Sequence, residues 1–213
     1  MTTGRFIAFE GGEGMGKSTQ ARLLQAALSK MGITAVLTRE PGGTPGAEAV
    51  RKLLLDPPGE GWGAEAEALL FAAARADHVQ RLIRPALARG DWVVCDRFID
   101  SSRAYQGHAG SLGDEKVCQL HEIGSAGLLP DLTILIAADE TDVAHRLRAR
   151  DGDASDAIGG RDKQYHAKVN RGFDQFAAQE PQRFARIDGG GAVEDVHRRI
   201  MALMKATFGI HPT

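Results

Sequence analysis

The feature that most constrains this chain is the octapeptide at residues 11–18, Gly-Gly-Glu-Gly-Met-Gly-Lys-Ser. It has the spacing G-x-x-x-x-G-K-[ST] of a phosphate-binding P-loop, in which glycines allow successive backbone N–H groups to converge on phosphate oxygens. The apolar run at residues 6–9 precedes it, and apolar residues at helical spacing follow it. A strand, a glycine loop and a helix N-terminus in that order predict a nucleoside triphosphate site, and a chance glycine-rich turn is the weaker interpretation.

The residues predicted to hold the triphosphate are those of the octapeptide and the one after it: Gly11, Gly12, Glu13, Gly14, Met15, Gly16, Lys17, Ser18 and Thr19. In such loops the lysine reaches the β- and γ-phosphates, and the hydroxyl residue binds Mg²⁺. Lys17 is therefore a predicted catalytic residue and Ser18 a predicted metal ligand.

Length and charge limit the class of protein. The 213 residues suffice for one domain with a substantial core, so a single domain over residues 1–213 is expected. The 26 basic and 28 acidic residues nearly balance, which argues against a surface for nucleic acids or anionic membranes. No basic start precedes a long apolar stretch, and the longest apolar run is too short for a membrane span. These features predict a soluble, cytoplasmic protein.

Apolar runs of strand length alternate with segments of helical spacing. This alternation predicts an α/β fold with five parallel strands and helices on both faces of the sheet. The predicted strands cover residues 6–9, 35–37, 92–95, 132–137 and 184–187. The predicted helices cover residues 17–31, 46–55, 64–88, 114–126, 141–150, 163–178 and 193–207. Polar or glycine-rich motifs follow four of the five strands, at the carboxyl ends where such folds bind ligands.

The motif after the second predicted strand is Thr-Arg-Glu-Pro-Gly-Gly-Thr, residues 38–44. The Pro41-Gly42 pair indicates a turn. Arg39 and Glu40 would lie beside the P-loop if the second strand is a sheet neighbour of the first. A surface turn flanked by an exposed ion pair is an equally good interpretation.

Asp96 and Arg97 follow the third predicted strand. In a P-loop protein an acidic residue at a strand end is typical of a ligand of Mg²⁺ or of its bound water, because this ion prefers hard oxygen donors. Arg97 is suited to bind a phosphate through two hydrogen bonds. The alternative, a salt bridge between the two, is disfavoured because adjacent side chains of a strand point to opposite faces.

Phe71 and Arg75 lie four residues apart in a predicted helix and therefore share one face. An aromatic ring with an arginine one turn away can stack on a nucleobase and bind its edge. A phenylalanine at such a position is more often part of the core, and the arginine a solvated neighbour.

The polar, glycine-containing segment at about residues 150–162 predicts a mobile flap. Arg150 and Arg161 are candidates to move onto the transferring phosphates when the flap closes, which would make them catalytic. The alternative is a solvated charged loop.

Taken together, these motifs resemble those of the thymidylate kinase family of nucleoside monophosphate kinases. The resemblance covers essentially the whole chain and rests on an ordered set of stretches, which is more specific than a P-loop alone. The stretches are Phe9–Gly14 with Gly16–Thr19, Thr38–Thr44, Leu70 and Phe71 with Arg75, Asp96–Phe98, Ser101 with Ala104–Gly107, and Pro130–Leu132.

The resemblance implies the P-loop nucleoside monophosphate kinase fold and the reaction ATP + dTMP → ADP + dTDP, with Mg²⁺ held by Ser18 and Asp96. It also implies a homodimer formed through a helical face. The implied catalytic residues are Lys17, Arg97, Arg150 and Arg161. The implied dTMP-binding residues are Glu13, Arg39, Pro41, Phe71, Arg75, Arg97, Ser101, Tyr105 and Gln106.

Individual roles follow from the matched positions. Glu13 matches an acid that binds the deoxyribose 3′-hydroxyl, and Arg97 matches an arginine on the acceptor phosphate. Phe71 matches a ring that stacks on thymine, with Arg75 at the O4 edge of the base. Tyr105 and Gln106 match residues near sugar and base, and this tyrosine would crowd a 2′-hydroxyl, which favours deoxyribose.

The P-loop departs from one family pattern, because position 15 is Met15 and not an arginine. Family members that lack this arginine place a catalytic arginine in the flap. This resemblance therefore points to Arg150 and Arg161, which the sequence does not rank.

Two other functions remain open at this point. The first is a kinase for another pyrimidine nucleoside monophosphate, since one methyl group is worth only about 1–3 kcal/mol of discrimination. A P-loop regulator that binds nucleotide without transfer is the second, although the Asn-Lys-x-Asp motif of guanine-specific switches does not occur.

Overall fold

The computed structural model describes residues 4–139 and 157–210. Within them, five parallel strands form one sheet in the order β2-β3-β1-β4-β5. The strands are β1 (Phe6–Glu10), β2 (Ala35–Arg39), β3 (Trp92–Asp96), β4 (Leu132–Ala137) and β5 (Phe184–Asp188). The predicted five-stranded parallel sheet is confirmed, with strand ends that shift by one or two residues.

The position of each strand explains its composition. The central strands β1, β3 and β4 are almost entirely buried, as their continuous apolar sequences require. The edge strands β2 and β5 have more exposed positions. Because β3 lies between β2 and β1, the condition for placing Arg39 and Glu40 beside the P-loop, that the second strand neighbours the first, is not met. Residues after β2 therefore reach the P-loop region only across the end of β3.

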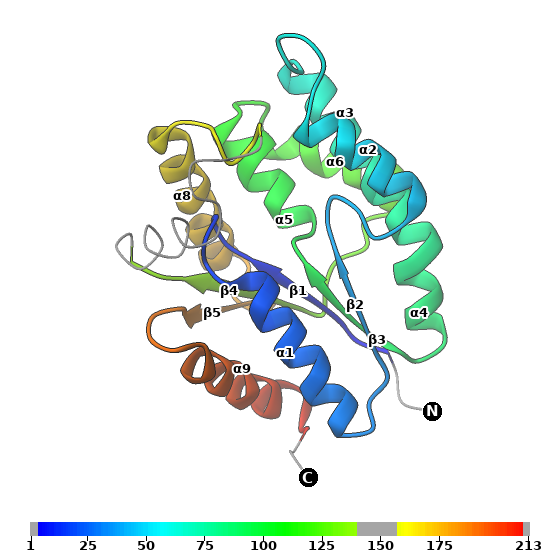
Figure 1. Ribbon diagram of the computed structural model, residues 1–213, viewed down its shortest axis with the longest axis vertical. Helices are drawn as coiled ribbons and strands as arrows, with labels where there is room; N and C mark the ends of the chain where they lie inside the picture. Colours follow the sequence, from blue (N-terminus) through cyan, green and yellow to red (C-terminus); the bar gives the residue numbers. More distant parts are fainter. Residues whose placement is uncertain (1–3, 140–156, 211–213) are drawn as a thin grey trace.

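Helices lie on both sides of the sheet (Figure 1). On one side α1 (Lys17–Lys30) packs against α9 (Val193–Phe208), and their apolar side chains form a core with the sheet. The other side carries α2 (Pro45–Leu55), α3 (Ala64–His78), α4 (Arg84–Ala88), α5 (Ile99–Ser102), α6 (Asp114–Ser125), α8 (Lys163–Gln179) and the π-helical segments η1 (Val79–Ile83) and η2 (Arg103–Ala109). In the described part of the chain, no helix has both the length and the apolarity to cross a bilayer.

Two helical regions differ from the prediction. The single helix predicted over residues 64–88 contains the π-helical turn η1 between α3 and α4. Pro85 follows this turn and has no N–H to donate to it, which favours a local departure from α-helical geometry. No helix is predicted for residues 99–109, yet α5 and η2 form there, with η2 packed against α8. Burial of residues such as Tyr105 in that interface stabilises the helical turns, although the local sequence is too polar to predict a helix.

Part of the predicted flap lies outside the described residues. This applies to Arg150 and to the predicted helix at residues 141–150. The described part, residues 157–161, forms turns that lead into α8. Asp162 caps that helix, because its side chain accepts a hydrogen bond from the backbone N–H of Tyr165 at 2.7 Å.

Candidate active site

A cavity of about 770 Å³ opens at the carboxyl ends of the strands. Segments that follow β1, β2, β3 and β5 line it, together with side chains from α3 and the α5–η2 region. This is the edge at which a parallel sheet binds ligands. Most of the predicted site residues line the cavity: Glu13, Gly14, Met15, Gly16, Lys17, Ser18, Thr19, Arg39, Pro41, Phe71, Arg75, Asp96, Arg97, Ser101, Tyr105 and Gln106.

The P-loop depends on backbone angles that favour glycine. Gly11 has a φ of +132°, and a Cβ there would collide with the carbonyl oxygen of Ile136 on β4. Gly16 has a φ of +86° and immediately precedes α1, so the helix N-terminus points toward the cavity. The free N–H groups of this first turn form an anion-binding site.

Lys17 is held inside this loop. Its ammonium group donates a hydrogen bond of 2.5 Å to the carbonyl of Gly12, and only 6% of the residue is exposed. Burial lowers the pKa of Lys17 to about 8, although nearby carboxylates such as Glu13 oppose the shift. Among residues 4–139 and 157–210 no carboxylate forms an ion pair with this buried ammonium, which favours the binding of a phosphate.

Ser18 and Asp96 form a hard-oxygen pair at the base of the loop. The Ser18 hydroxyl donates a hydrogen bond to Oδ2 of Asp96. The second oxygen, Oδ1, is buried and accepts no hydrogen bond from the described residues. A buried carboxylate oxygen without a donor is costly unless a cation or water completes it. A hydroxyl beside such a carboxylate therefore fits the ligand preference of Mg²⁺.

Arg97 has the left-handed backbone conformation, with a φ of +70°, which is uncommon for a residue with a side chain. Its guanidinium contacts both the P-loop and the α5–η2 region. It donates to the Gly11 carbonyl at 3.0 Å, to the Ser101 hydroxyl at 3.0 Å and to the Tyr105 hydroxyl at 3.3 Å. Its ion pair is with Glu13, at 2.6 Å, and not with the adjacent Asp96.

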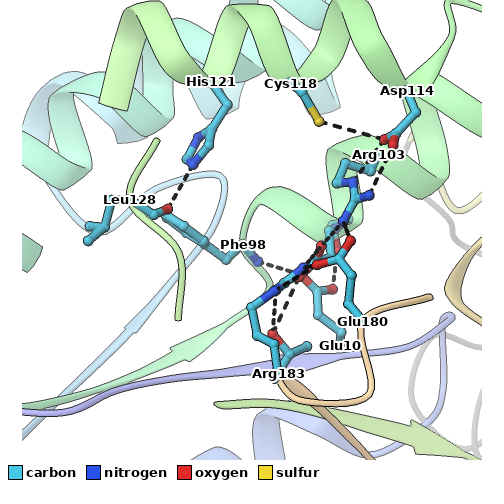
Figure 2. Close-up of polar contacts among 12 residues, drawn as sticks. Glu10, Phe98, Arg103, Asp114, Cys118, His121, Leu128, Glu180 and Arg183 are labelled. Carbon is cyan, nitrogen blue, oxygen red and sulfur yellow. Dashed lines mark hydrogen bonds and ion pairs between the residues drawn. The ribbon is translucent and has the colours of Figure 1, made fainter. Parts of the chain in front are cut away.

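Glu10, at the end of β1, holds the segment that carries Arg97. One carboxylate oxygen accepts the backbone N–H groups of Phe98 and Ser101 at 2.8 and 3.0 Å, and the other accepts the Ser101 hydroxyl at 2.6 Å. The residue is fully buried, and Figure 2 shows it beside Phe98, below the cluster around Arg103 and Glu180. Burial raises the pKa of Glu10 to about 7, with a smaller contribution from the charge of Asp100.

Two arginines neutralise the buried Asp100 on α5. Arg183 donates to its two oxygens at 2.6 and 2.9 Å, and Arg103 donates to it at 2.9 Å. Both arginines also bind Glu180 at the end of α8, and Arg103 binds Asp114 on α6 (Figure 2). This network links the α5–η2 region to α6 and to Glu180, and so it holds the cavity-lining residues of that region in position.

We expect Glu10→Gln to remove part of the pH dependence of stability while keeping the fold. The amide oxygen can still accept both backbone N–H groups, and the new NH₂ can donate to the Ser101 hydroxyl. In the wild type the raised pKa of Glu10 means that the folded state binds more protons than the unfolded state between about pH 4.5 and 7. This stabilisation, roughly 3 kcal/mol, is full below that window and is lost as the pH rises through it.

The measurement is the free energy of unfolding in urea between pH 4.5 and 8, for the wild type and Glu10→Gln. The slope across the window should flatten in the variant. The exposed Glu115 on α6 supplies the matched control, and Glu115→Gln should keep the wild-type slope. Parallel curves for the wild type and Glu10→Gln would contradict the role of this carboxylate.

Phe71 and Arg75 line the cavity from one face of α3, as their spacing predicts. Arg75 is buried and held rigidly, because its guanidinium donates to Glu40 at 2.7 Å and to the Ser102 hydroxyl at 2.8 Å. Glu40 in turn contacts His78 at 2.9 Å. The exposed ion pair considered for residues 39 and 40 is therefore not observed, since Glu40 is a buried partner of α3.

Arg39 and Pro41 line the neighbouring wall of the cavity. Arg39 is exposed and pairs with Glu48 on α2 at 3.2 Å. The carbonyl of Pro41 accepts a hydrogen bond from Arg51 on the same helix at 2.7 Å. The Glu40–Pro41 peptide bond is cis.

Several lining residues are missing from the sequence prediction. They are Gln20, Arg22, Glu40, Arg51, Leu55, Phe98, Ser102, Ile158, Gly189, Gly191, Val193 and Val196. Gly189 and Gly191 follow β5, so the rule that ligands bind at strand carboxyl ends would have found them. Arg51 lies on α2, and nothing in its local sequence distinguishes it from a surface arginine. Of the predicted residues, Gly11, Gly12 and Arg161 do not line the cavity, although both glycine carbonyls bind residues that do.

Comparison with known proteins gives a consistent result. The family model for thymidylate kinase matches residues 9–200. A thymidylate kinase of Rhizorhabdus wittichii is 56% identical over 199 residues, which cover 93% of this chain and 95% of that protein. A thymidylate kinase of Rhodopseudomonas palustris is 49% identical over 199 residues, covering 92% of this chain and 86% of that protein.

A solved structure agrees with these sequence matches. The crystal structure of thymidylate kinase from Ehrlichia chaffeensis superimposes with a TM-score of 0.78 at 32% sequence identity, and the match covers 94% of this chain and 98% of that one. Its likeness extends over the sheet, the P-loop and the helices that surround the cavity, since nearly the whole of each chain is included. This chain therefore belongs to the thymidylate kinase family of nucleoside monophosphate kinases.

Proposed function

We propose that the residues around the cavity bind ATP and dTMP and catalyse the transfer of the γ-phosphoryl group of ATP to dTMP, which gives dTDP and ADP. As a member of its family, the chain is an ATP-dependent nucleoside monophosphate kinase. One observation supports the proposal: the P-loop lines the same cavity as Arg97, Phe71 and Arg75. Two nucleotides can thus meet with their phosphates between Lys17 and Arg97.

The P-loop holds the donor. Its amides and the N-terminus of α1 bind the triphosphate oxygens, and Lys17 exchanges its contact with Gly12 for the β- and γ-phosphates. Ser18 and Asp96 would hold Mg²⁺, which neutralises charge on the β- and γ-phosphates when it is bound. Phosphoryl transfer needs positioning and charge stabilisation more than covalent help, and this arrangement supplies both.

The other half of the cavity holds dTMP. Arg97 and Ser101 bind the acceptor phosphate, with Arg39 and Pro41 on the neighbouring wall. Phe71 stacks on thymine, Arg75 donates to its O4 edge, and Gln106 lies near the base. Glu13 binds the 3′-hydroxyl, and the Tyr105 ring excludes a 2′-hydroxyl. The contacts among Arg97, Glu13 and Tyr105 hold these groups in place before the substrate arrives.

A coupled assay of ADP release with a panel of acceptors tests this function. We expect dTMP to give the highest kcat/KM, dUMP a value about 10- to 100-fold lower because it lacks the methyl group, and UMP, CMP and AMP little turnover. Preference for UMP or CMP would assign the enzyme to another pyrimidine monophosphate. Binding of ATP without transfer to any acceptor would favour a nucleotide-binding regulator.

The assembly we propose is a homodimer formed through α3 and α6, which pack side by side. Each helix exposes a large apolar side chain, Leu69 at 55% and Ile123 at 85%. Such residues on adjacent helices indicate a contact surface between protein chains. Both cysteines are free thiols, as is typical of the cytoplasm, where we place the enzyme.

We expect Ile123→Lys, combined with Leu69→Lys, to convert the protein from dimer to monomer, because lysine ammonium groups cannot be desolvated there without partners. Analytical ultracentrifugation gives the mass directly. Leu37→Lys on the edge strand β2 is the control for a surface change elsewhere, since Leu37 is also exposed, and it should remain dimeric. A wild type that sediments as a monomer would contradict the proposed assembly.

A further inference from the structure

Glu67, in the first turn of α3, contacts Gln106, which lines the proposed acceptor subsite, and it has no role in the assignments above. It precedes Phe71 by four residues and Arg75 by eight, so all three share one face of the helix. Only 9% of the residue is exposed. Its carboxylate bridges two partners, because one oxygen accepts the side-chain NH₂ of Gln106 at 2.9 Å and the other pairs with the guanidinium of Arg161.

This contact constrains the Gln106 carboxamide. A carboxamide has a donor end and an acceptor end of nearly the same shape, and it can rotate to exchange them. A carboxylate paired with arginine only accepts hydrogen bonds, so Gln106 must turn its NH₂ toward Glu67. The carboxamide oxygen of Gln106, whose side chain lines the cavity, is therefore held on the side that faces away from Glu67.

The ion pair with Arg161 offsets the energetic cost of burying the Glu67 carboxylate. The Arg161 guanidinium pairs with Glu67, contacts the Tyr165 hydroxyl and lies over the ring of that tyrosine, 4.7 Å from its centroid. The Tyr165 hydroxyl donates at 2.7 Å to the backbone carbonyl of Tyr105, the residue before Gln106. Arg161 therefore neutralises the charge of Glu67, and the Glu67 carboxylate still acts only as a hydrogen-bond acceptor toward Gln106.

We propose that Glu67 is a positioning residue for base specificity, which holds Gln106 as a hydrogen-bond acceptor and so selects a pyrimidine with a protonated ring nitrogen. Thymine and uracil carry a donor N–H between two carbonyl groups. Cytosine has a lone pair at the same ring position, which would face the carboxamide oxygen without a hydrogen. This inference rests on the proposed function, which places the acceptor base beside Phe71 and Gln106.

The test is the ratio of kcat/KM for dTMP to that for dCMP in Glu67→Gln. A glutamine at position 67 can donate or accept, so Gln106 is no longer held in one orientation, and we expect the ratio to fall by about ten-fold or more. The loss should appear mainly as a higher KM for the acceptor. Turnover of dUMP should fall in parallel with that of dTMP, because both bases carry the same N–H. Glu65→Gln, an exposed change in the same helical turn, should keep the wild-type ratio.

Exchange of the two side chains provides a rescue. In the double variant Glu67→Gln with Gln106→Glu, residue 106 can only accept and residue 67 donates to it. The ratio should return to within a few-fold of the wild-type value, which a merely structural role would not produce. If the single variant does not fold, this exchange carries the test, and a ratio that stays low would overturn the proposal.

Two further outcomes are distinguishable. If Glu67→Gln lowers kcat equally for dTMP, dUMP and dCMP and leaves the ratio unchanged, the inference about Glu67 is wrong while the kinase assignment stands. If the wild-type protein transfers phosphate to none of the three, the proposed function itself fails.

Discussion

Replacement of Lys17 by methionine is expected to lower kcat by about a thousand-fold or more, roughly 4 kcal/mol of transition-state stabilisation. Methionine preserves the length of the buried stem, so the P-loop should keep its shape. What is lost is the ammonium group, which binds the Gly12 carbonyl in the free protein and can exchange that neutral partner for phosphate. The low exposure of this side chain means that water cannot replace the missing charge effectively.

The measurement is steady-state turnover of ATP and dTMP, with circular dichroism and thermal unfolding to establish that the variant is folded. Lys30→Met, at the exposed end of the same helix, controls for the loss of one lysine and should turn over like the wild type. In the wild type, kcat/KM for ATP should also decrease above about pH 8, because burial lowers the pKa of Lys17 to about 8 and the neutral amine attracts phosphate less. Comparable activity in Lys17→Met would contradict the assigned role of the P-loop.

The second large effect concerns the flap arginines. We expect Arg150→Ala to lower kcat by about a thousand-fold with a much smaller change in the KM for dTMP, as for an arginine that contacts the phosphates only in the transition state. Arg161→Ala should have a smaller effect on kcat, because Glu67 and Tyr165 already hold the Arg161 guanidinium outside the cavity lining. Arg150 lies outside the described residues, so its assignment depends on this comparison.

Both variants should be assayed at saturating ATP and over a range of dTMP concentrations, which separates kcat from acceptor affinity. Arg171→Ala, an exposed change on α8, serves as the control for the loss of one arginine. If Arg161→Ala shows the larger loss of kcat, the two roles are exchanged. If neither variant loses more than a few-fold, catalysis by a flap arginine is wrong for this enzyme.

The sequence by itself determined the strand–loop–helix unit around Lys17, the parallel sheet and the family, because each of these depends on local patterns. A P-loop needs particular glycines at particular spacings, and buried parallel strands need continuous apolar runs, so both are visible in a few neighbouring residues. The spacing of Phe71 and Arg75 likewise placed them on one helical face before any fold was known. The resemblance then joined these local signals into one reaction.

The tertiary structure alone decided which distant residues meet. Strand order placed β3 between β1 and β2, and no local pattern encodes that order. Residues 103–109 form η2, which packs against α8, and Glu40, directly after β2, became a buried partner of Arg75 on α3. The contact of Glu67 with Gln106 and Arg161 joins positions 39 and 94 residues apart. Such contacts follow from how whole elements pack, since hydrogen bonds and ion pairs between distant residues depend on the three-dimensional position of both partners.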